Sequence, residues 1–185
     1  MQNIEREIAE IDKIHFKMVR ENIFNFIKRA GKETNKEGLI LLDIAPQDHE
    51  GAAPHFPGAT IKTLDINPKS GASYIADICG DNSKIIPANE FDVVICTEVL
   101  EHTLNPFAAV QEIKRILKPG GVAFVTTPFN FRIHGPRPDC WRFTEDGLRA
   151  LFAQFDIQEL NALEDADRFL MPIHYSLIAR KKYHE

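Results

Sequence analysis

The sequence lacks the features that mark several large classes of protein. It has three cysteines in 185 residues, Cys79, Cys96 and Cys140. Their odd number and wide spacing favour reduced thiols over a disulfide framework or a C-x-x-C metal site. The longest apolar runs reach only the length of a β-strand, which excludes a membrane span. The net charge is −5, with no basic run beyond residues 180–182, so nothing indicates a nucleic-acid groove.

A secretory leader is also missing, because polar and charged residues follow Met1 where a signal peptide would have an apolar segment. We therefore expect a cytoplasmic protein that works on a small molecule, with no nucleic-acid or membrane partner; a homo-oligomer is left open. The length suits one domain with a proper core.

Two short apolar runs, residues 39–44 and 61–66, indicate strands buried on both faces of a parallel sheet. Each has an aspartate near its carboxyl end, Asp43 in the first and Asp65 in the second. Ligands of open α/β sheets bind beyond the carboxyl ends of the strands, and an acid about twenty residues after the first turn is the usual partner of a ribose diol. We therefore expect Asp65 to bind a ribose; the alternative is a turn aspartate before Asn67.

The turn after the first strand lacks the G-x-G-x-x-G pattern with which backbone closes on a pyrophosphate. Residues 43–51 read D-I-A-P-Q-D-H-E-G instead. Asp48 and Glu50 would repel a phosphate, whereas a cationic ligand would tolerate them. The turn thus argues against a dinucleotide.

The rest of the chain alternates strands and helices, which is typical of a doubly wound α/β sheet. Asn105 and Pro106 fit the N-cap and first position of one helix, and Thr144 fits the N-cap of a short one. The further strands that we expect cover residues 74–78, 91–96 and 122–127, with 155–160 and 169–179 as an antiparallel edge pair. A third strand-end acid, Asp77, suits an exocyclic amine such as that of adenine, or is simply solvated.

The first part of the chain has an amphipathic helical pattern over residues 3–30, in one helix or two, which we expect Gly31 to end. Residues 1–37 then form a helical cap and linker, and 38–185 the main domain. The cap either covers the sheet edge or acts as a lid over the substrate.

A long irregular segment, residues 128–143, follows the fifth expected strand and is rich in aromatic and basic side chains. Its arginines, which include Arg132 and Arg137, suit the recognition of an anionic group on the acceptor. The alternative is that they pair with Asp139 and hold the loop together. Trp141 suits a sugar or ring face, or else plugs the core under the loop.

Taken together, these motifs resemble the class I S-adenosylmethionine-dependent methyltransferases, in particular small-molecule enzymes of glycan and secondary-metabolite pathways. The resemblance covers roughly residues 38–179 and is specific in the order and spacing of its parts. The motifs that carry it are L-L-D-I at 41–44, L-D-I at 64–66, A-D-I at 76–78, F-D-V-V-I-C-T-E-V-L-E-H at 91–102 and L-K-P-G-G at 117–121.

The resemblance implies a Rossmann-like α/β fold with a mostly parallel seven-stranded sheet and an antiparallel edge hairpin. It implies methyl transfer from S-adenosylmethionine, with S-adenosylhomocysteine as product, to a small acceptor such as a sugar or nucleotide-linked sugar. The cofactor-binding residues would be Asp43, Ala45, Pro46, Gln47, Asp65, Ile66, Asp77, Ile78, Thr97, Glu98, Val99 and His102. The substrate-binding residues would be Arg132, His134, Arg137 and Trp141.

Two residues are candidates for catalysis. Glu98 would favour the sulfonium electrostatically; the alternative is a carboxylate at a helix start. His134, in the acceptor-side loop, would serve as a general base, or else only packs or caps the loop. His102 lies one helical turn after Glu98 and is expected to be a structural hydrogen bonder. No metal site is expected, because His134, Cys140 and His174 lack metal-ligand spacing.

One departure from the family pattern leaves an alternative open. The first turn of the family carries D-x-G-x-G, and here Ala45 and Gln47 stand in place of the glycines. The alternative is therefore a non-catalytic binding module that keeps the fold and has lost affinity for the cofactor.

Overall fold

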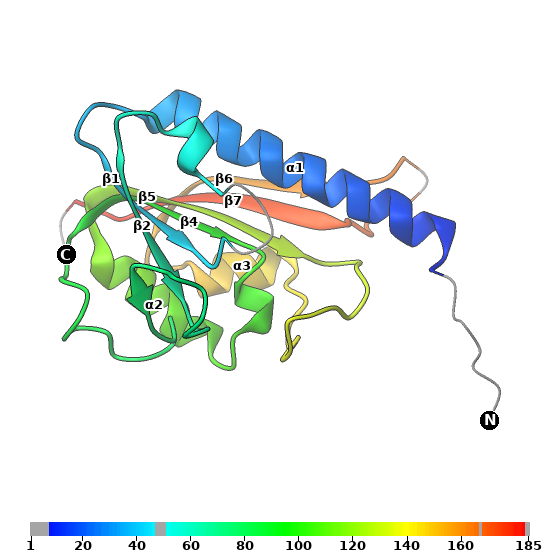
Figure 1. The fold of residues 1–185 in the computed structure, drawn as a ribbon. Helices are drawn as coiled ribbons and strands as arrows, with labels where there is room; N and C mark the ends of the chain where they lie inside the picture. Colours follow the sequence, from blue (N-terminus) through cyan, green and yellow to red (C-terminus); the bar gives the residue numbers. More distant parts are fainter. Residues whose placement is uncertain (1–7, 47–50, 167, 184–185) are drawn as a thin grey trace.

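The computed structural model describes residues 8–46, 51–166 and 168–183. The predictions made for residues 3–7, Gln47, Asp48 and Glu50 lie outside these ranges. The described chain forms a seven-stranded sheet with helices on both faces (Figure 1). The strands are β1 (Ile40–Ile44), β2 (Thr60–Asp65), β3 (Tyr74–Ile75), β4 (Phe91–Thr97), β5 (Leu117–Pro128), β6 (Asp156–Leu163) and β7 (His174–Arg180).

The strand order is β3-β2-β1-β4-β5-β7-β6. The five strands from β3 to β5 in that order are parallel, and β7 runs antiparallel to both β5 and β6. This arrangement confirms the predicted Rossmann-like sheet and its antiparallel edge hairpin. The third strand is shorter than expected, two residues instead of five.

The central strands are buried on both faces because their apolar residues alternate between two cores. In β4, Val94 and Cys96 pack on the side of the two later helices. Val93 and Ile95 pack on the opposite side, against the first helix. A continuous apolar run is what such a doubly covered strand requires.

The two later helices begin at the residues that the sequence indicates. In α2 (Pro106–Ile116), the Asn105 side chain accepts a hydrogen bond from the Ala108 amide at 3.1 Å. In α3 (Glu145–Leu151), the Thr144 hydroxyl accepts from the Gly147 amide at 3.1 Å. Both N-cap predictions are confirmed, since each side chain satisfies an amide that the helix leaves unpaired.

The expected alternation of strands and helices is incomplete in the first half of the sheet. The connection from β1 to β2 contains only the 3₁₀ turn η1 (Ala53–His55), and no helix lies between β2 and β4 in the described residues. The N-terminal helix α1 (Glu10–Thr34) covers this face instead. Its Phe26 ring meets Phe124 of β5 edge-on at 5.7 Å.

Helix α1 is one continuous helix of 25 residues that runs past Gly31 to Thr34, so the prediction that Gly31 ends it was wrong. This glycine marks a close approach of two backbones. A Cβ placed on Gly31 would lie 2.2 Å from the carbonyl oxygen of His55 in η1. The missing side chain therefore lets α1 lie directly on the β1–β2 connection.

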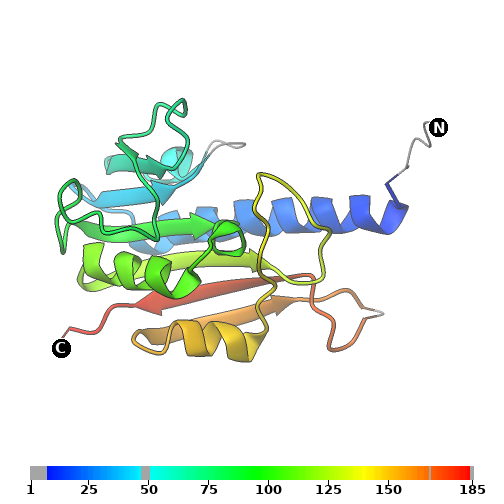
Figure 2. The same cartoon turned by 90° about the horizontal axis from the view of Figure 1, so that it is seen from below.

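The N-terminal half of α1 reaches past the carboxyl edge of the sheet, where it lies beside the loop that follows β5 (Figure 2). This placement suits the lid alternative better than a helix that only covers an edge. No helix in the described part of the chain is both long and apolar enough to cross a bilayer.

We expect Gly31→Ala to lower the free energy of unfolding by about 1 to 3 kcal/mol, the usual cost of overpacking. Alanine gains about 1 kcal/mol in helix propensity over glycine, but the contact with the His55 carbonyl is too short for a side-chain adjustment to relieve. Urea denaturation measures the difference. Lys32→Ala, at the exposed neighbouring position, is the control and should change little; equal stability of Gly31→Ala and wild type would contradict the close approach.

Candidate functional site

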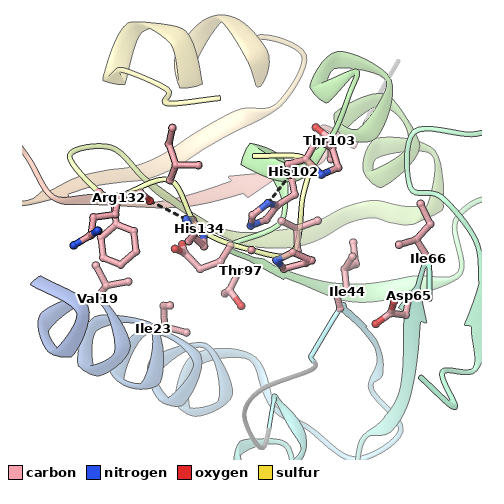
Figure 3. Close-up of a pocket in the computed structure, with 18 of the residues that line it drawn as sticks. Val19, Ile23, Ile44, Asp65, Ile66, Thr97, His102, Thr103, Arg132 and His134 are labelled. Carbon is pink, nitrogen blue, oxygen red and sulfur yellow. Dashed lines mark hydrogen bonds between the residues drawn. The ribbon is translucent and has the colours of Figure 1, made fainter. Parts of the chain in front are cut away.

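A cavity of about 870 Å³ opens at the carboxyl edge of the parallel strands. Its walls come from the ends of β1, β2 and β4, from the first half of α1 and from the loop after β5. Figure 3 shows Asp65 and Ile66 at one end of this cavity and Val19 and Arg132 at the other, with Thr97 and His134 between them. The volume lies at the upper end of the range of about 300 to 1,000 Å³ for small-molecule sites, which leaves room for two ligands side by side.

The structure brings most of the predicted site residues together in this wall. Those that line the cavity are Ala45, Asp65, Ile66, Asp77, Ile78, Thr97, Glu98, Val99, His102, Arg132 and His134. Asp43, Pro46, Arg137 and Trp141 are not among the lining residues, and Gln47 lies outside the described ranges. The expected ligand contacts of these four residues are thus not supported.

The turn after β1 holds Ala45 in a left-handed conformation, with φ +52°. This region favours glycine, because a Cβ crowds the backbone there. Asp43 lies below the turn, where one carboxylate oxygen accepts the Ala52 amide at 2.7 Å. Asp43 therefore shapes the turn from beneath, and Ala45 faces the cavity.

Glu98, the residue directly after β4, also has a left-handed backbone, with φ +54°. Its Oε1 accepts hydrogen bonds from the Nε2 of His174 at 2.7 Å and from the Thr126 hydroxyl at 2.9 Å. The other ring nitrogen of His174 meets the Asn22 side-chain amide at 2.9 Å. Two strained residues thus stand at neighbouring strand ends in one cavity wall, and such strain clusters at functional sites.

The charge of Glu98 follows from these contacts. Burial alone would raise the pKa of Glu98, but the His174 ring and the Thr126 hydroxyl outweigh burial, so this pKa lies below its ordinary value. A buried carboxylate that stays ionised at neutral pH suits a cationic ligand. It is a weak acceptor for a proton.

Asp65, the last residue of β2, and Asp77, after β3, each accept a hydrogen bond within a turn and also line the cavity. The Oδ1 of Asp65 accepts the Asn67 amide at 2.7 Å, and the side chain is nearly buried at the cavity wall. Asp77, which is exposed, accepts the Cys79 amide at 2.8 Å. Asp65 therefore holds the turn, as one alternative predicts, and also lines the cavity, where ribose binding stays a prediction.

The loop after β5 is fastened to η2 (Leu100–His102), the 3₁₀ turn that follows β4. The Glu101 carbonyl accepts the amides of Cys140 at 2.7 Å and Trp141 at 3.2 Å. The Trp141 indole N–H donates to the Thr103 carbonyl at 2.7 Å. Trp141 thus secures the loop, which explains why its ring is not in the cavity wall.

Two of the three arginines of this loop, Arg132 and Arg142, have ion-pair partners within the protein. Arg142 forms a two-pronged ion pair with Asp139, and this bond is the main reason that the pKa of Asp139 lies far below its usual range. Arg132 reaches across to Asp12 of α1 at 2.9 Å. Arg137 is exposed. The internal brace is thus the alternative that the structure supports for Arg142.

Several wall and network residues were not predicted. The first half of α1 and Ile8, just before it, line the cavity; the helix residues are Asp12, Lys13, Phe16, Val19, Arg20 and Ile23. Their amphipathic pattern showed a helix, but it did not show that the helix reaches past the sheet. His174 and Asn22 were missed because the Glu98–His174 and His174–Asn22 hydrogen bonds join residues 76 and 152 positions apart.

Comparison with known proteins identifies the family of this chain. A model described as a methyltransferase domain matches residues 15–175. A ubiquinone biosynthesis O-methyltransferase of Haemophilus ducreyi is 34% identical over 88 residues, 46% of this chain and 31% of that protein. A thiol S-methyltransferase of Rattus norvegicus is 44% identical over 121 residues, 57% of this chain and 48% of that one. The chain thus spans less than half the length of either relative.

A solved structure shares the fold. It is phosphoethanolamine N-methyltransferase 2 of Haemonchus contortus in complex with S-adenosyl-L-methionine, with a TM-score of 0.65 at 16% identity. The match covers 88% of this chain and 52% of that one. Sheet order, cavity position and family model agree, and the chain belongs to the methyltransferase-domain family, among the class I S-adenosylmethionine-dependent methyltransferases.

We expect Ala45→Gly to raise the free energy of unfolding by about 0.5 to 1 kcal/mol. A left-handed alanine costs about 1 to 2 kcal/mol, and the greater entropy of unfolded glycine returns about 0.5 to 1. Ala150→Gly, at an exposed position of α3, is the control and should lower stability by about 1 kcal/mol. If both variants lose stability equally in urea denaturation, the turn does not hold Ala45 in this conformation.

Asp43 should make stability fall as pH rises from about 4 to about 6. Burial raises the pKa of Asp43 from 3.8 to about 6, although the Ala52 amide lowers it. Between these two pH values the folded state holds a proton that the unfolded state has released. Ionisation of Asp43 above pH 6 therefore lowers the free energy of unfolding by about 3 kcal/mol, at 1.36 kcal/mol per pH unit. In Asp43→Asn this part of the fall should be absent. Urea denaturation at pH 4, 5, 6 and 7 measures it, and parallel pH profiles would contradict the shift.

Proposed function

We propose that the protein transfers a methyl group from S-adenosylmethionine to a small, largely apolar acceptor. The observation that carries this proposal is the single cavity wall formed by Asp65, Ala45 and Glu98 at the ends of β2, β1 and β4. Membership of the family makes methyl transfer the expected reaction. A wall with this many acids and no cationic side chain near the strand ends suits a cationic cofactor better than a phosphate.

The cofactor would occupy the end of the cavity formed by the sheet. Asp65 would accept hydrogen bonds from the ribose hydroxyls, and the exposed Ile66 would cover one face of the adenine. Asp77 would take the exocyclic amine. These roles follow the positions of the residues at the strand ends, where ligands of such sheets bind.

The acceptor would occupy the other end, between α1 and the loop after β5. Apolar side chains dominate there, and the rings of Phe16 and Phe131 stack at 6.4 Å. An apolar wall favours a ring or chain that bears one reactive hydroxyl or thiol over the sugar that the sequence first suggested. The O- and S-methyltransferases among the relatives are consistent with such acceptors.

Methyl transfer from a sulfonium is an in-line displacement in which the acceptor atom bonds the methyl carbon as the carbon–sulfur bond breaks. Alignment of the two ligands supplies most of the acceleration. Glu98, ionised and fixed by His174 and Thr126, would stabilise the positive sulfur before transfer. Its role is therefore electrostatic.

His134 keeps a proposed role on the acceptor side, but its geometry differs from that of a free general base. Its Nδ1 faces the Arg132 carbonyl at 3.1 Å, and its Nε2 lies 3.8 Å from Glu101 Oε1. The nitrogen that could accept a proton is thus directed at a buried carboxyl group. Direct removal of the acceptor proton by His134 has less support than its place in the loop suggested.

A non-catalytic binding module is the second candidate. The left-handed Ala45, in a position that favours glycine, motivates it, since the methyl group stands where backbone would approach the cofactor. Cofactor binding separates the two candidates.

We expect S-adenosylhomocysteine to bind the wild type in a calorimetric titration and Asp65→Ala to bind it at least tenfold more weakly. Hydrogen bonds to a charged group contribute about 1.5 to 3 kcal/mol each, and 1.4 kcal/mol is a factor of ten. Asp156→Ala, at an exposed position of the edge strand β6, is the matched control and should bind like the wild type.

Two outcomes would count against the proposal. If the wild type binds neither S-adenosylhomocysteine nor S-adenosylmethionine, the binding-module candidate takes its place. If it binds both but Asp65→Ala binds equally well, the cofactor lies elsewhere in the cavity. Turnover of labelled S-adenosylmethionine with panels of phenols, thiols and sugars then tests the acceptor class, and methylation of sugars alone would contradict an apolar acceptor.

A further inference from the structure

Glu101 is the most unusual polar side chain in the described part of the chain. It is fully buried in η2, and neither carboxylate oxygen has a hydrogen-bond partner among the described residues. A buried carboxyl group without a partner is costly to the fold. Its Oε1 faces two ring nitrogens instead, the Nε2 of His102 at 3.6 Å and the Nε2 of His134 at 3.8 Å.

The backbone decides which nitrogen of each ring carries the proton. The Nδ1 of His102 lies 2.8 Å from the Pro138 carbonyl oxygen. The Nδ1 of His134 lies 3.1 Å from the Arg132 carbonyl oxygen and 3.3 Å from Asp139 Oδ2. Carbonyl and carboxylate oxygens only accept hydrogen bonds, so each Nδ1 must donate. In the neutral rings both Nε2 atoms then carry lone pairs, and both lone pairs are on the side of Glu101.

This is the arrangement in which histidines hold metal ions. A ligating histidine almost always donates its other ring N–H to a carbonyl or carboxylate, which fixes the ring and its tautomer. Here both rings are fixed in this way before any ion is present. The loop after β5 is also fastened to η2 through the Glu101 carbonyl, so the three donors belong to one locally braced unit.

We propose that Glu101, His102 and His134 bind a divalent transition-metal ion in the cavity wall. One ring nitrogen of each histidine and one Glu101 oxygen all lie within 4.8 Å of one another. Zinc bonds nitrogen and oxygen at about 2.0 to 2.2 Å, so two donors at a tetrahedral angle are about 3.4 Å apart. The two separations from Glu101 Oε1, 3.6 and 3.8 Å, are close to this value, and a separation of 4.8 Å would contract by about 1.4 Å on loading.

The ligand set selects the class of ion. Two imidazoles and one carboxylate suit zinc, iron, cobalt or nickel, whereas calcium and magnesium prefer oxygen donors. The surrounding charge is compatible with a cation, because Glu98 is ionised nearby and the positive Arg142 is already paired with Asp139. Sequence spacing alone did not indicate this site, since His134 is 32 positions beyond His102 and comes from another element.

The position of the site suggests its use. His102 and His134 line the cavity (Figure 3), whereas Glu101 is fully buried and is not among the lining residues. With three protein ligands, an ion of this class keeps at least one open position, and that position would face the acceptor end. If the proposed function holds, the ion would bind the oxygen or sulfur of the acceptor and orient it towards the methyl group. The metal site itself does not depend on that function.

The test is metal binding by the full chain without a histidine tag, after removal of metals with a chelator. Equilibrium dialysis against Zn²⁺ with elemental analysis gives the stoichiometry, and Co²⁺ gives a visible spectrum that reports its ligands. We expect one ion per chain, bound at least tenfold more weakly by Glu101→Gln, by His134→Gln and by the double variant His102→Gln/His134→Gln. His55→Gln, a histidine outside the cavity wall, is the matched control and should bind like the wild type.

The proposal is overturned if the wild type binds Zn²⁺ and Co²⁺ no more tightly than the double variant, or if His55→Gln loses as much affinity. Should Glu101→Gln fail to fold, the double variant decides, because both histidines are only partly buried. S-adenosylhomocysteine titration of each variant keeps the two proposals apart. A variant that loses metal binding but still binds S-adenosylhomocysteine bears on the metal site alone. A variant that still binds metal but loses S-adenosylhomocysteine binding bears on the proposed function alone.

Discussion

The carboxyl edge of the sheet depends on one buried histidine, His174 of β7. Its ring meets Asn22 of α1 on one side and Glu98 on the other, and Glu98 in turn accepts the Thr126 hydroxyl of β5. Four elements that are far apart in sequence are thereby joined through one chain of hydrogen bonds. These hydrogen bonds hold Glu98 in its left-handed conformation. They also keep the Glu98 carboxylate charged at the cavity, because each of its partners favours the ionised form.

The second constraint is the coverage of the sheet. In the first half of the fold the described residues contain no crossover α-helix, and α1 provides the apolar face that such helices would otherwise supply. Gly31 makes this possible at the closest point, against η1. Because the helix must span the whole face, its other end extends past the strands, and that end becomes part of the cavity wall. The same helix thus covers the core with one part and lines the cavity with another.

Much of the fold could be predicted from sequence because it rests on local signals. Continuous apolar runs gave the central strands, and single polar side chains gave the starts of α2 and α3. The strand-end residues of the site could also be predicted, since parallel strands bring their carboxyl ends to one edge. Asp65 and Glu98 are examples.

What could not be predicted depends on contacts between distant segments. Gly31 looks like a helix terminator in sequence, and only the backbone of His55 reveals its other role. Trp141 looks like a ligand platform until its bond to the Thr103 carbonyl is seen. Glu101 stood inside a predicted motif, yet nothing local showed that its carboxyl group would be buried without a partner.

The two ends of the cavity are encoded by separate parts of the chain. The proposed cofactor end is built from strand termini that the whole sheet holds in place. The proposed acceptor end is built from α1 and the loop after β5, which are joined there by the Arg132–Asp12 ion pair and the Phe16–Phe131 contact. Substitutions in these two segments can therefore reshape the acceptor end without disturbing the strand termini. In a lineage with this architecture, the surface segments can diverge while the strand termini are inherited unchanged.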